Sequence, residues 1–233
     1  MALDPVSTEP PVKPTGGRIL VACALKRETD SIKDLLPRHV ELLTTGVGSR
    51  HTRKILIRRL QRSPAPGVLV FTGTAGQLDP ACAMGTVVCP ERWLIDDDKT
   101  TGQISGDLME RLRARGWVIA GSGLTVSLPV MRASSRLDLF QRTGAAICDM
   151  EAAAALQVAA QFGIPALAVK VISDGGDCDF LDFYRNLNKN LHSLGLYLQR
   201  LLQELTEILP SMPIQTGEAS SPGDGMTSPL TEL

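Results

Sequence analysis

Short apolar runs alternate with amphipathic stretches of helical period along this chain, and that alternation constrains the fold more than any other feature. The runs at 18–24, 67–71 and 165–172 are rich in Val, Ile, Leu and Ala. Strands that are apolar at successive positions are typical of sheets covered on both faces. The first run leads into a helical pattern over 26–36, which Pro37 ends. The sequence therefore predicts an α/β fold.

Acidic residues follow three of the expected strands. Glu28 comes after the first run, Glu151 after the run at 145–149 and at the start of an Ala-rich helix, and Asp174 after the run at 165–172. Small residues at 72–76 are expected to form a loop that lets a ligand approach the backbone. Because open α/β sheets bind ligands at the carboxyl ends of their strands, we expect these acids to share one site.

The length of 233 residues favours a single domain. Eight of the fifteen prolines lie in the two ends of the chain, among Ser, Thr and Gly and without an apolar period. We therefore expect disordered tails over 1–16 and 210–233 and a folded domain over 17–209. A leucine stripe over 187–209 predicts a long amphipathic helix that packs on the sheet.

Charge and cysteine content limit the classes of partner and the cellular location that we expect for this protein. The 24 basic residues nearly balance the 25 acidic ones, so no global field favours nucleic acid. The basic stretch at 50–62 is expected to be a solvated helix face. Five cysteines without paired spacing, and the lack of a secretory or membrane-spanning run, favour a cytoplasmic protein. The three histidines lack metal-ligand spacing, and no metal site is expected.

Five short motifs occur in a fixed order. They are Ala24-Leu-Lys-Arg-Glu28, Gly46-Val-Gly48, Thr72-Gly-Thr-Ala-Gly76, Cys148-Asp-Met-Glu151 and Val169-Lys-Val-Ile-Ser-Asp174. Together they resemble the purine nucleoside and uridine phosphorylase superfamily, most closely its methylthioadenosine/adenosylhomocysteine nucleosidase branch. The resemblance spans about 18–205. It implies three layers with a central mixed β-sheet, a nucleoside substrate, no cofactor, and a homodimer or higher homo-oligomer.

The resemblance also implies roles for the three acids. Asp174 resembles the acid that protonates the departing purine at N7, Glu151 the carboxylate that holds the ribose hydroxyls, and Glu28 the base that activates water. Cleavage of an N-glycosidic bond needs these functions, because the sugar gains oxocarbenium character while electrons move into the base.

Seven further residues are expected to contact substrate or water on the same grounds. Met150 would lie against the sugar and Thr74 would help to hold the water. The others are Gly73, Ser173, Lys170, Val130 and Met131, of which the last two fall where the family's backbone lines the base pocket.

Water is the expected nucleophile because phosphorylases carry phosphate-binding arginines at two positions where this chain has Phe71 and Glu28. Two alternatives stay open. A phosphorylase could bind phosphate through Arg27, Lys170 or a neighbouring subunit's Arg50, and a nucleoside-binding protein could keep the pocket without turnover.

Two departures from the nucleosidase pattern bear on activity and substrate. Lys170 stands where Arg is usual, which replaces a bidentate fork with a point charge. Met131-Arg132 stands where an aromatic-aliphatic pair is common, so methylthioadenosine, adenosylhomocysteine, futalosine and adenosylhopane all remain candidate substrates. Taken singly, Glu28 and Glu151 could only complement helix dipoles, and Asp174 could be a turn residue.

Overall fold

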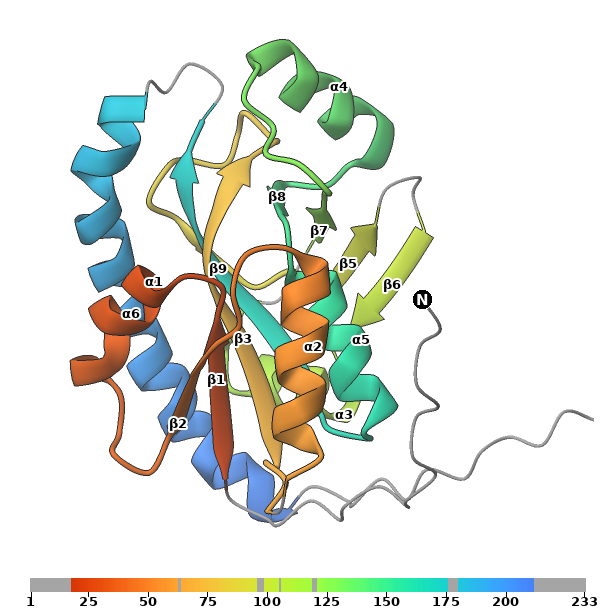
Figure 1. The fold of residues 1–233 in the computed structure, drawn as a ribbon, viewed down its shortest axis with the longest axis vertical. Coiled ribbons are helices and arrows are strands. Elements are labelled where there is room, and N and C mark those ends of the chain that lie inside the picture. Colours follow the sequence, from red (N-terminus) through yellow and green to blue (C-terminus); the bar gives the residue numbers. More distant parts are fainter. Residues whose placement is uncertain are drawn as a thin grey trace, which may run out of the picture.

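The computed structural model describes residues 18–62, 64–95, 99–104, 106–118, 121–175 and 180–211. In these residues one mixed sheet lies between two layers of helices (Figure 1), which confirms the expected fold class. The tails predicted at 1–16 and 210–233 lie outside the described residues, except for 210 and 211. These two residues belong to a short 3-10 helix, Leu209–Ser211, the last described element of the chain.

Three parallel strands form the centre of the sheet. They are β1 (Ile19–Cys23), β3 (Val68–Gln77) and β9 (Ala166–Asp174), and β3 pairs with both of the others. The remaining strands are β2 (Glu41–Thr44), β4 (Val87–Val88), β5 (Arg92–Ile95), β6 (Lys99–Gln103), β7 (Ser122–Thr125) and β8 (Ile147–Asp149). The strand order is β2-β1-β3-β8-β7-β5-β6, and β9 pairs with β3 and β4. The sheet is mixed because β8 runs antiparallel to the end of β3.

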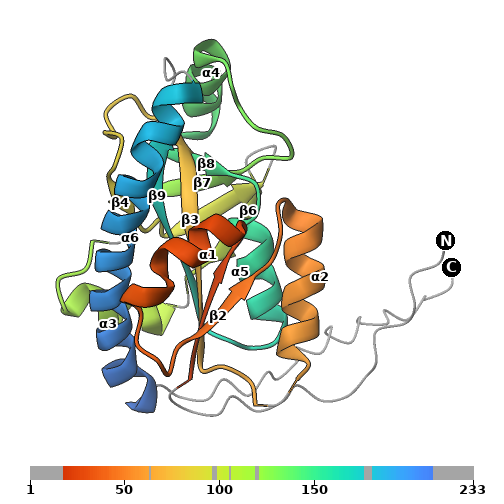
Figure 2. The ribbon, with the colours of Figure 1, turned by 60° about the vertical axis from the view of Figure 1, so that its left-hand side comes forward.

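Successive side chains of the central strands pack into two separate cores, as the two-residue period of a strand requires. One core faces α1 (Lys26–Ile32), α3 (Gly106–Ala114) and α6 (Phe180–Ile208), and it takes the leucine stripe of α6. The other faces α2 (Ser49–Leu60) and the alanine-rich α5 (Ala152–Gln161). Figure 2 shows α6 and α2 on opposite sides of the sheet, with α4 (Ala133–Thr143) beyond its end.

The prediction of a loop at 72–76 is wrong, because these residues continue strand β3 to Gln77. Thr72 to Gly76 pair with β9 on one side, and Gly76 and Gln77 also pair with β8. Partners on two sides provide backbone hydrogen bonds that outweigh the low strand propensity of glycine. Similarly, β9 runs through Asp174, which is its last residue rather than part of a turn.

Helix boundaries differ from the expected ones by a few residues. The helical pattern over 26–36 is α1 to Ile32, followed by a 3-10 helix, Lys33–Leu35. The last helix begins at Phe180, seven residues before the expected leucine stripe. Among the described residues, no helix combines the length and the apolar character that crossing a bilayer requires.

Candidate active site

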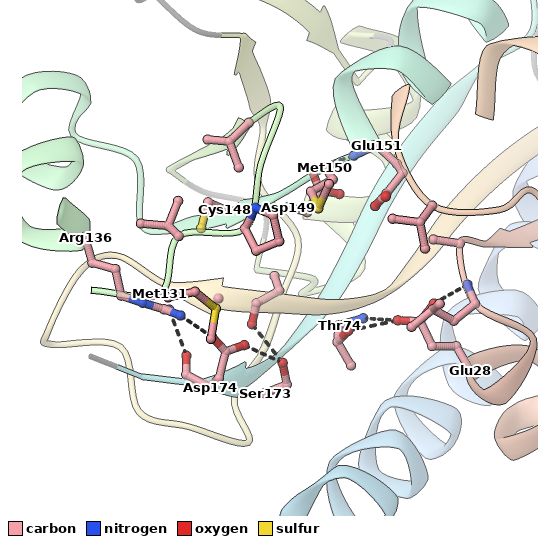
Figure 3. Close-up of a pocket in the computed structure, with 18 residues that line it drawn as sticks. Glu28, Thr74, Met131, Arg136, Cys148, Asp149, Met150, Glu151, Ser173 and Asp174 are labelled. Carbon is pink, nitrogen blue, oxygen red and sulfur yellow. Dashed lines mark hydrogen bonds and ion pairs between the residues drawn. The ribbon is translucent and has the colours of Figure 1, made fainter. Parts of the chain in front are cut away.

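A cavity of about 290 Å³ opens at the carboxyl ends of the central strands (Figure 3), close to the lower end of the ~300–1,000 Å³ typical of small-molecule sites. It brings together eight of the predicted site residues: Glu28, Thr74, Val130, Met131, Met150, Glu151, Ser173 and Asp174. The other two predicted residues, Gly73 and Lys170, do not line it. The three predicted acids therefore line one cavity at this edge of the sheet.

Glu28 joins the start of α1 to strand β3. One oxygen of its carboxylate, Oε2, accepts the backbone N–H of Leu25 at 3.0 Å and so caps the helix. The other, Oε1, accepts both the backbone N–H of Thr74 at 2.8 Å and its hydroxyl at 2.9 Å. Glu28 lies in the first turn of α1, where a carboxylate complements the helix dipole, but the contact with this helix is only one of the three hydrogen bonds that its carboxylate accepts.

Gly73 makes this arrangement possible without lining the cavity. A Cβ at this position would lie 2.6 Å from Glu28 Oε1, and the φ of +139° is one that other residues rarely adopt. Gly73 therefore acts through the space it leaves for the carboxylate.

Glu151 lies where β8 passes into α5. Its Oε1 accepts the backbone N–H of Gly48 at 2.6 Å, and the Ser49 hydroxyl donates to the Met150 carbonyl at 2.9 Å. The N-cap and the first residue of α2 thus hold Glu151 and Met150 in place. Burial raises the pKa of the Glu151 carboxyl, and the nearby charge of Lys170 opposes this shift.

Lys170 does not line the cavity but forms a buried ion pair that the sequence did not indicate. Its Nζ is 2.9 Å from Asp149 Oδ2, with side chains only 1% and 2% exposed, and it lies 4.5 Å from the centre of the Phe71 ring. Burial lowers the pKa of Lys170, but the carboxylates of Asp149, Glu151 and Glu28 together outweigh it and raise the pKa. The lysine is therefore a permanent positive charge behind the carboxylates.

Asp149 extends this buried network to the start of α5. Its carboxylate accepts the Thr125 hydroxyl at 2.8 Å and the backbone N–H of Ala152 at 2.9 Å. A carboxylate at a helix N-terminus is stabilised by the free N–H groups there. The motif that predicted Glu151 contains Asp149 as well, so the signal was present, but strand and helix patterns alone assign no contact to it.

Asp174 occupies the other end of the cavity and is paired with Arg136 of α4. The guanidinium donates to Asp174 Oδ2, while the Ser173 hydroxyl donates to Oδ1 at 2.9 Å. Sequence patterns did not single out Arg136, because it lies 38 residues from its partner in an otherwise exposed amphipathic helix.

Four carboxylates and one guanidinium line the cavity among the described residues: Glu28, Asp149, Glu151, Asp174 and Arg136. Apolar groups supply much of the remaining wall, and burial raises the pKa of the Cys148 thiol to about 12, so this wall is uncharged there. The described part of the chain contains no cluster of three or more His, Cys, Asp or Glu suited to a metal ion. The site can therefore hold a neutral ligand that carries hydroxyl groups, and it opposes an anion.

Comparisons with known proteins bear on the family and on the fold. A family model described as the phosphorylase superfamily matches residues 38–203. The search of curated proteins found no significant match.

Solved structures with the same fold include a 5′-methylthioadenosine/S-adenosylhomocysteine nucleosidase from Helicobacter pylori, at 16% identity and a TM-score of 0.69 over 81% of this chain and 99% of that one. The futalosine hydrolase of the same organism has 16% identity and a TM-score of 0.67 over 82% and 98%. A Campylobacter jejuni 5′-methylthioadenosine/S-adenosylhomocysteine nucleosidase has 17% identity and a TM-score of 0.67 over 82% and 100%.

Proposed function

The chain belongs to the phosphorylase superfamily, and we propose that within it this protein is a purine nucleoside N-ribosyl hydrolase. In this proposal it releases a purine base from a 5′-modified ribose, with water as the nucleophile. The expected resemblance to this superfamily is confirmed, whereas the reaction, the substrate and the residue roles are proposals.

The contact between Glu28 and Thr74 is the observation that best supports water, and not phosphate, as the nucleophile. The carboxylate accepts both the backbone N–H and the hydroxyl of Thr74, a residue of β3 that lines the cavity, so neither donor is free for a phosphate. A phosphate dianion would have to displace the carboxylate and would face three further acids. Neither Arg27 nor Lys170 lines the cavity to compensate, and the only guanidinium on the described wall is paired with Asp174.

The reaction needs two proton transfers at opposite ends of the cavity, where Figure 3 shows Glu28 and Asp174. As the bond between C1′ and N9 breaks, its electron pair moves into the purine. The proton of Asp174 passes to N7, so that the base leaves neutral. Water adds its oxygen to C1′ and gives a proton to Glu28. The products are the free base and a free sugar.

The remaining predicted residues support substrate in this proposal. Glu151 accepts hydrogen bonds from the ribose hydroxyls and Met150 packs against the sugar, while the backbone of Val130 and Met131 borders the base. Ser173 contacts Asp174, and Gly73 and Lys170 act from outside the cavity, through space and charge. An oxocarbenium-like transition state is stabilised by the surplus of negative charge around it.

The substrate's 5′ group is proposed from the fold neighbours. Their names include 5′-methylthioadenosine/S-adenosylhomocysteine nucleosidases and futalosine hydrolase, and we take those nucleosides, with adenosylhopane, as candidates. The half-exposed apolar side chains of Leu25 and Val47 at the cavity suit an apolar 5′ substituent. We also propose that the protein is a homo-oligomer, that it is located in the cytoplasm, and that it does not bind nucleic acid.

A nucleoside panel tests the proposal. Desalted protein is incubated with methylthioadenosine, adenosylhomocysteine, futalosine, adenosylhopane and inosine, with and without phosphate, and the products are identified by mass. We expect free base and free sugar from a purine nucleoside at a rate independent of phosphate. Ribose 1-phosphate, or a rate proportional to phosphate, would show a phosphorylase. Tight binding without base release would show a binding protein.

A further inference from the structure

Building on the proposed hydrolase, we propose that Arg136 is a positioning residue for the leaving-group acid. In this proposal it fixes the carboxyl of Asp174 so that Oδ1 carries the transferable proton, and it stabilises the anion that remains after transfer. The residue lies in α4, outside every motif that identifies the family, so the acid's support comes from a separate part of the chain.

The contacts of Arg136 converge on the ends of two strands. Its Nη1 donates to the carbonyl of Gln77 at 3.1 Å and to the carbonyl of Asp174 at 3.3 Å, and its Nη2 pairs with Asp174 Oδ2. Figure 3 shows the arginine reaching toward Asp174 beside the cavity. A Cβ on Gly76 would lie 2.7 Å from Nη1, so the missing side chain in β3 leaves room for the guanidinium.

Burial separates this pair from a surface salt bridge. The Arg136 side chain is only 7% exposed, and its Nε is buried with no hydrogen-bond partner among the described residues. By contrast, Arg142 pairs with Asp138 on the same helix with 54% of its side chain exposed. Desolvating a guanidinium and leaving one donor unpaired costs free energy, which the contact with Asp174 must offset.

Donor chemistry then assigns the proton. Arginine has five N–H donors and no acceptor, so Oδ2 acts as an acceptor in its contact with Nη2 and does not carry the hydrogen there. The proton of a neutral Asp174 therefore belongs on Oδ1, whose partner is the Ser173 hydroxyl. That hydroxyl can turn its own hydrogen to the carbonyl of Ala75, 3.3 Å away, and accept from Oδ1. The proton can then pass to the purine from Oδ1, an oxygen whose position is fixed by these contacts.

The charge of Arg136 favours the transfer itself. When the proton moves to the purine, Asp174 becomes an anion beside a fixed cation, so their attraction is stronger after the transfer than before it. An interaction that strengthens toward the transition state raises the rate of the chemical step, whereas one that is equal in both states affects only binding.

A double-mutant cycle tests this on the nucleoside that the wild type cleaves best. The variants are Arg136→Met, Arg136→Gln, Arg136→Lys, Asp174→Asn and Arg136→Met/Asp174→Asn, with Arg142→Met as the matched control on α4. We expect Arg136→Met to lower kcat by about 10²-fold with little change in KM, since a misplaced catalytic group costs about that much. Arg136→Lys should recover part of the loss, and Arg142→Met should match the wild type.

The cycle separates positioning from fold support. If Arg136 acts through Asp174, Arg136→Met causes no further loss of kcat once Asp174 is Asn, because the acid is already absent. Losses of kcat that add up in the double variant, or a rise in KM with kcat unchanged, would overturn the inference. Circular dichroism and thermal melting check each fold, and Arg136→Gln, which keeps donors without the charge, replaces Arg136→Met in the cycle if that variant does not fold. A wild type that releases no base would instead defeat the proposed function, and the inference with it.

Discussion

The two ends of the cavity hold their acids by different means. At the Glu28 end, neutral donors surround the carboxylate: two backbone N–H groups and the Thr74 hydroxyl. At the Asp174 end, the carboxylate is paired with the guanidinium of Arg136 and with the Ser173 hydroxyl. One acid is thus held by neutral donors from strand β3 and from the start of its own helix, and the other by a charge from helix α4.

The difference matches what each end does in the proposed reaction. A group that takes a proton from water must remain basic, and neutral hydrogen bonds orient it without cancelling its charge. A group that gives a proton to the leaving base becomes an anion, and a neighbouring cation stabilises that product. Two carboxyl groups acquire opposite roles through their surroundings. The predictions below alter one end of the cavity at a time.

The largest effect is expected for Asp174→Asn, which removes the proton donor while keeping an oxygen for Arg136. We expect kcat to fall by about 10²–10⁴-fold, the usual contribution of general-acid catalysis. Base release measured by chromatography gives the rate, and thermal melting checks that the fold is kept. Near wild-type activity would show that Asp174 only ends its strand and does not donate the proton.

Gly73→Ala tests the Glu28 end by moving its carboxylate. The added Cβ would lie 2.6 Å from Glu28 Oε1, so the carboxylate must shift, and we expect kcat to fall by about 10²-fold. Gly116→Ala is the matched control, because Gly116 also has a positive φ, +82°, but nothing lies within 4 Å of the added atom. Equal losses of activity in both variants would point to backbone strain and not to Glu28.

The next prediction concerns Glu151. The variant Glu151→Gln should mainly weaken the binding of the nucleoside. Loss of a charged hydrogen bond to the ribose costs about 1.5–3 kcal/mol, or roughly one to two powers of ten in affinity. Calorimetry with a non-hydrolysable nucleoside analogue measures this.

The pH dependence of binding gives a second test of Glu151. Burial raises its pKa above the ordinary 4.5, and only the ionised form accepts hydrogen bonds through both oxygens. The wild type's affinity should therefore rise as the pH increases from 4.5 through the raised pKa, and the Gln variant should lose this rise. A pH-dependent rise that survives in Glu151→Gln would have to come from another group.

The smallest effect is expected for Thr74→Val, which keeps the backbone N–H contact to Glu28 and removes only the hydroxyl contact. A hydrogen bond to a charged group contributes about 1.5–3 kcal/mol. We expect the lower end of this range, a fall in kcat of about tenfold, because the backbone N–H contact still orients the carboxylate. Thr74→Ser keeps the hydroxyl and should retain most of the activity. A loss of several hundredfold in Thr74→Val would mean that the hydroxyl contacts the reacting water directly.

Local patterns were sufficient for the site residues that come at or just after the end of a strand. The apolar runs predicted the central strands, and the acids that follow them, Glu28, Glu151 and Asp174, share the cavity. They were accessible to sequence reasoning because the carboxyl end of a strand is a local property, and parallel strands bring such ends to one edge. The extent of β3 was not accessible, since residues 73–77 are held in the strand by pairing with β8 and β9, which lie far away in the chain.

The sequence by itself determined the α/β class, the family resemblance and the identity of the three candidate acids, because strand periodicity and short motifs act over a few residues. Only the tertiary structure decided which charges those acids face. Lys170 meets Asp149 and Arg136 meets Asp174 across 21 and 38 residues of chain. Charge pairing depends on distance in space and on burial, and neither follows from spacing along the chain.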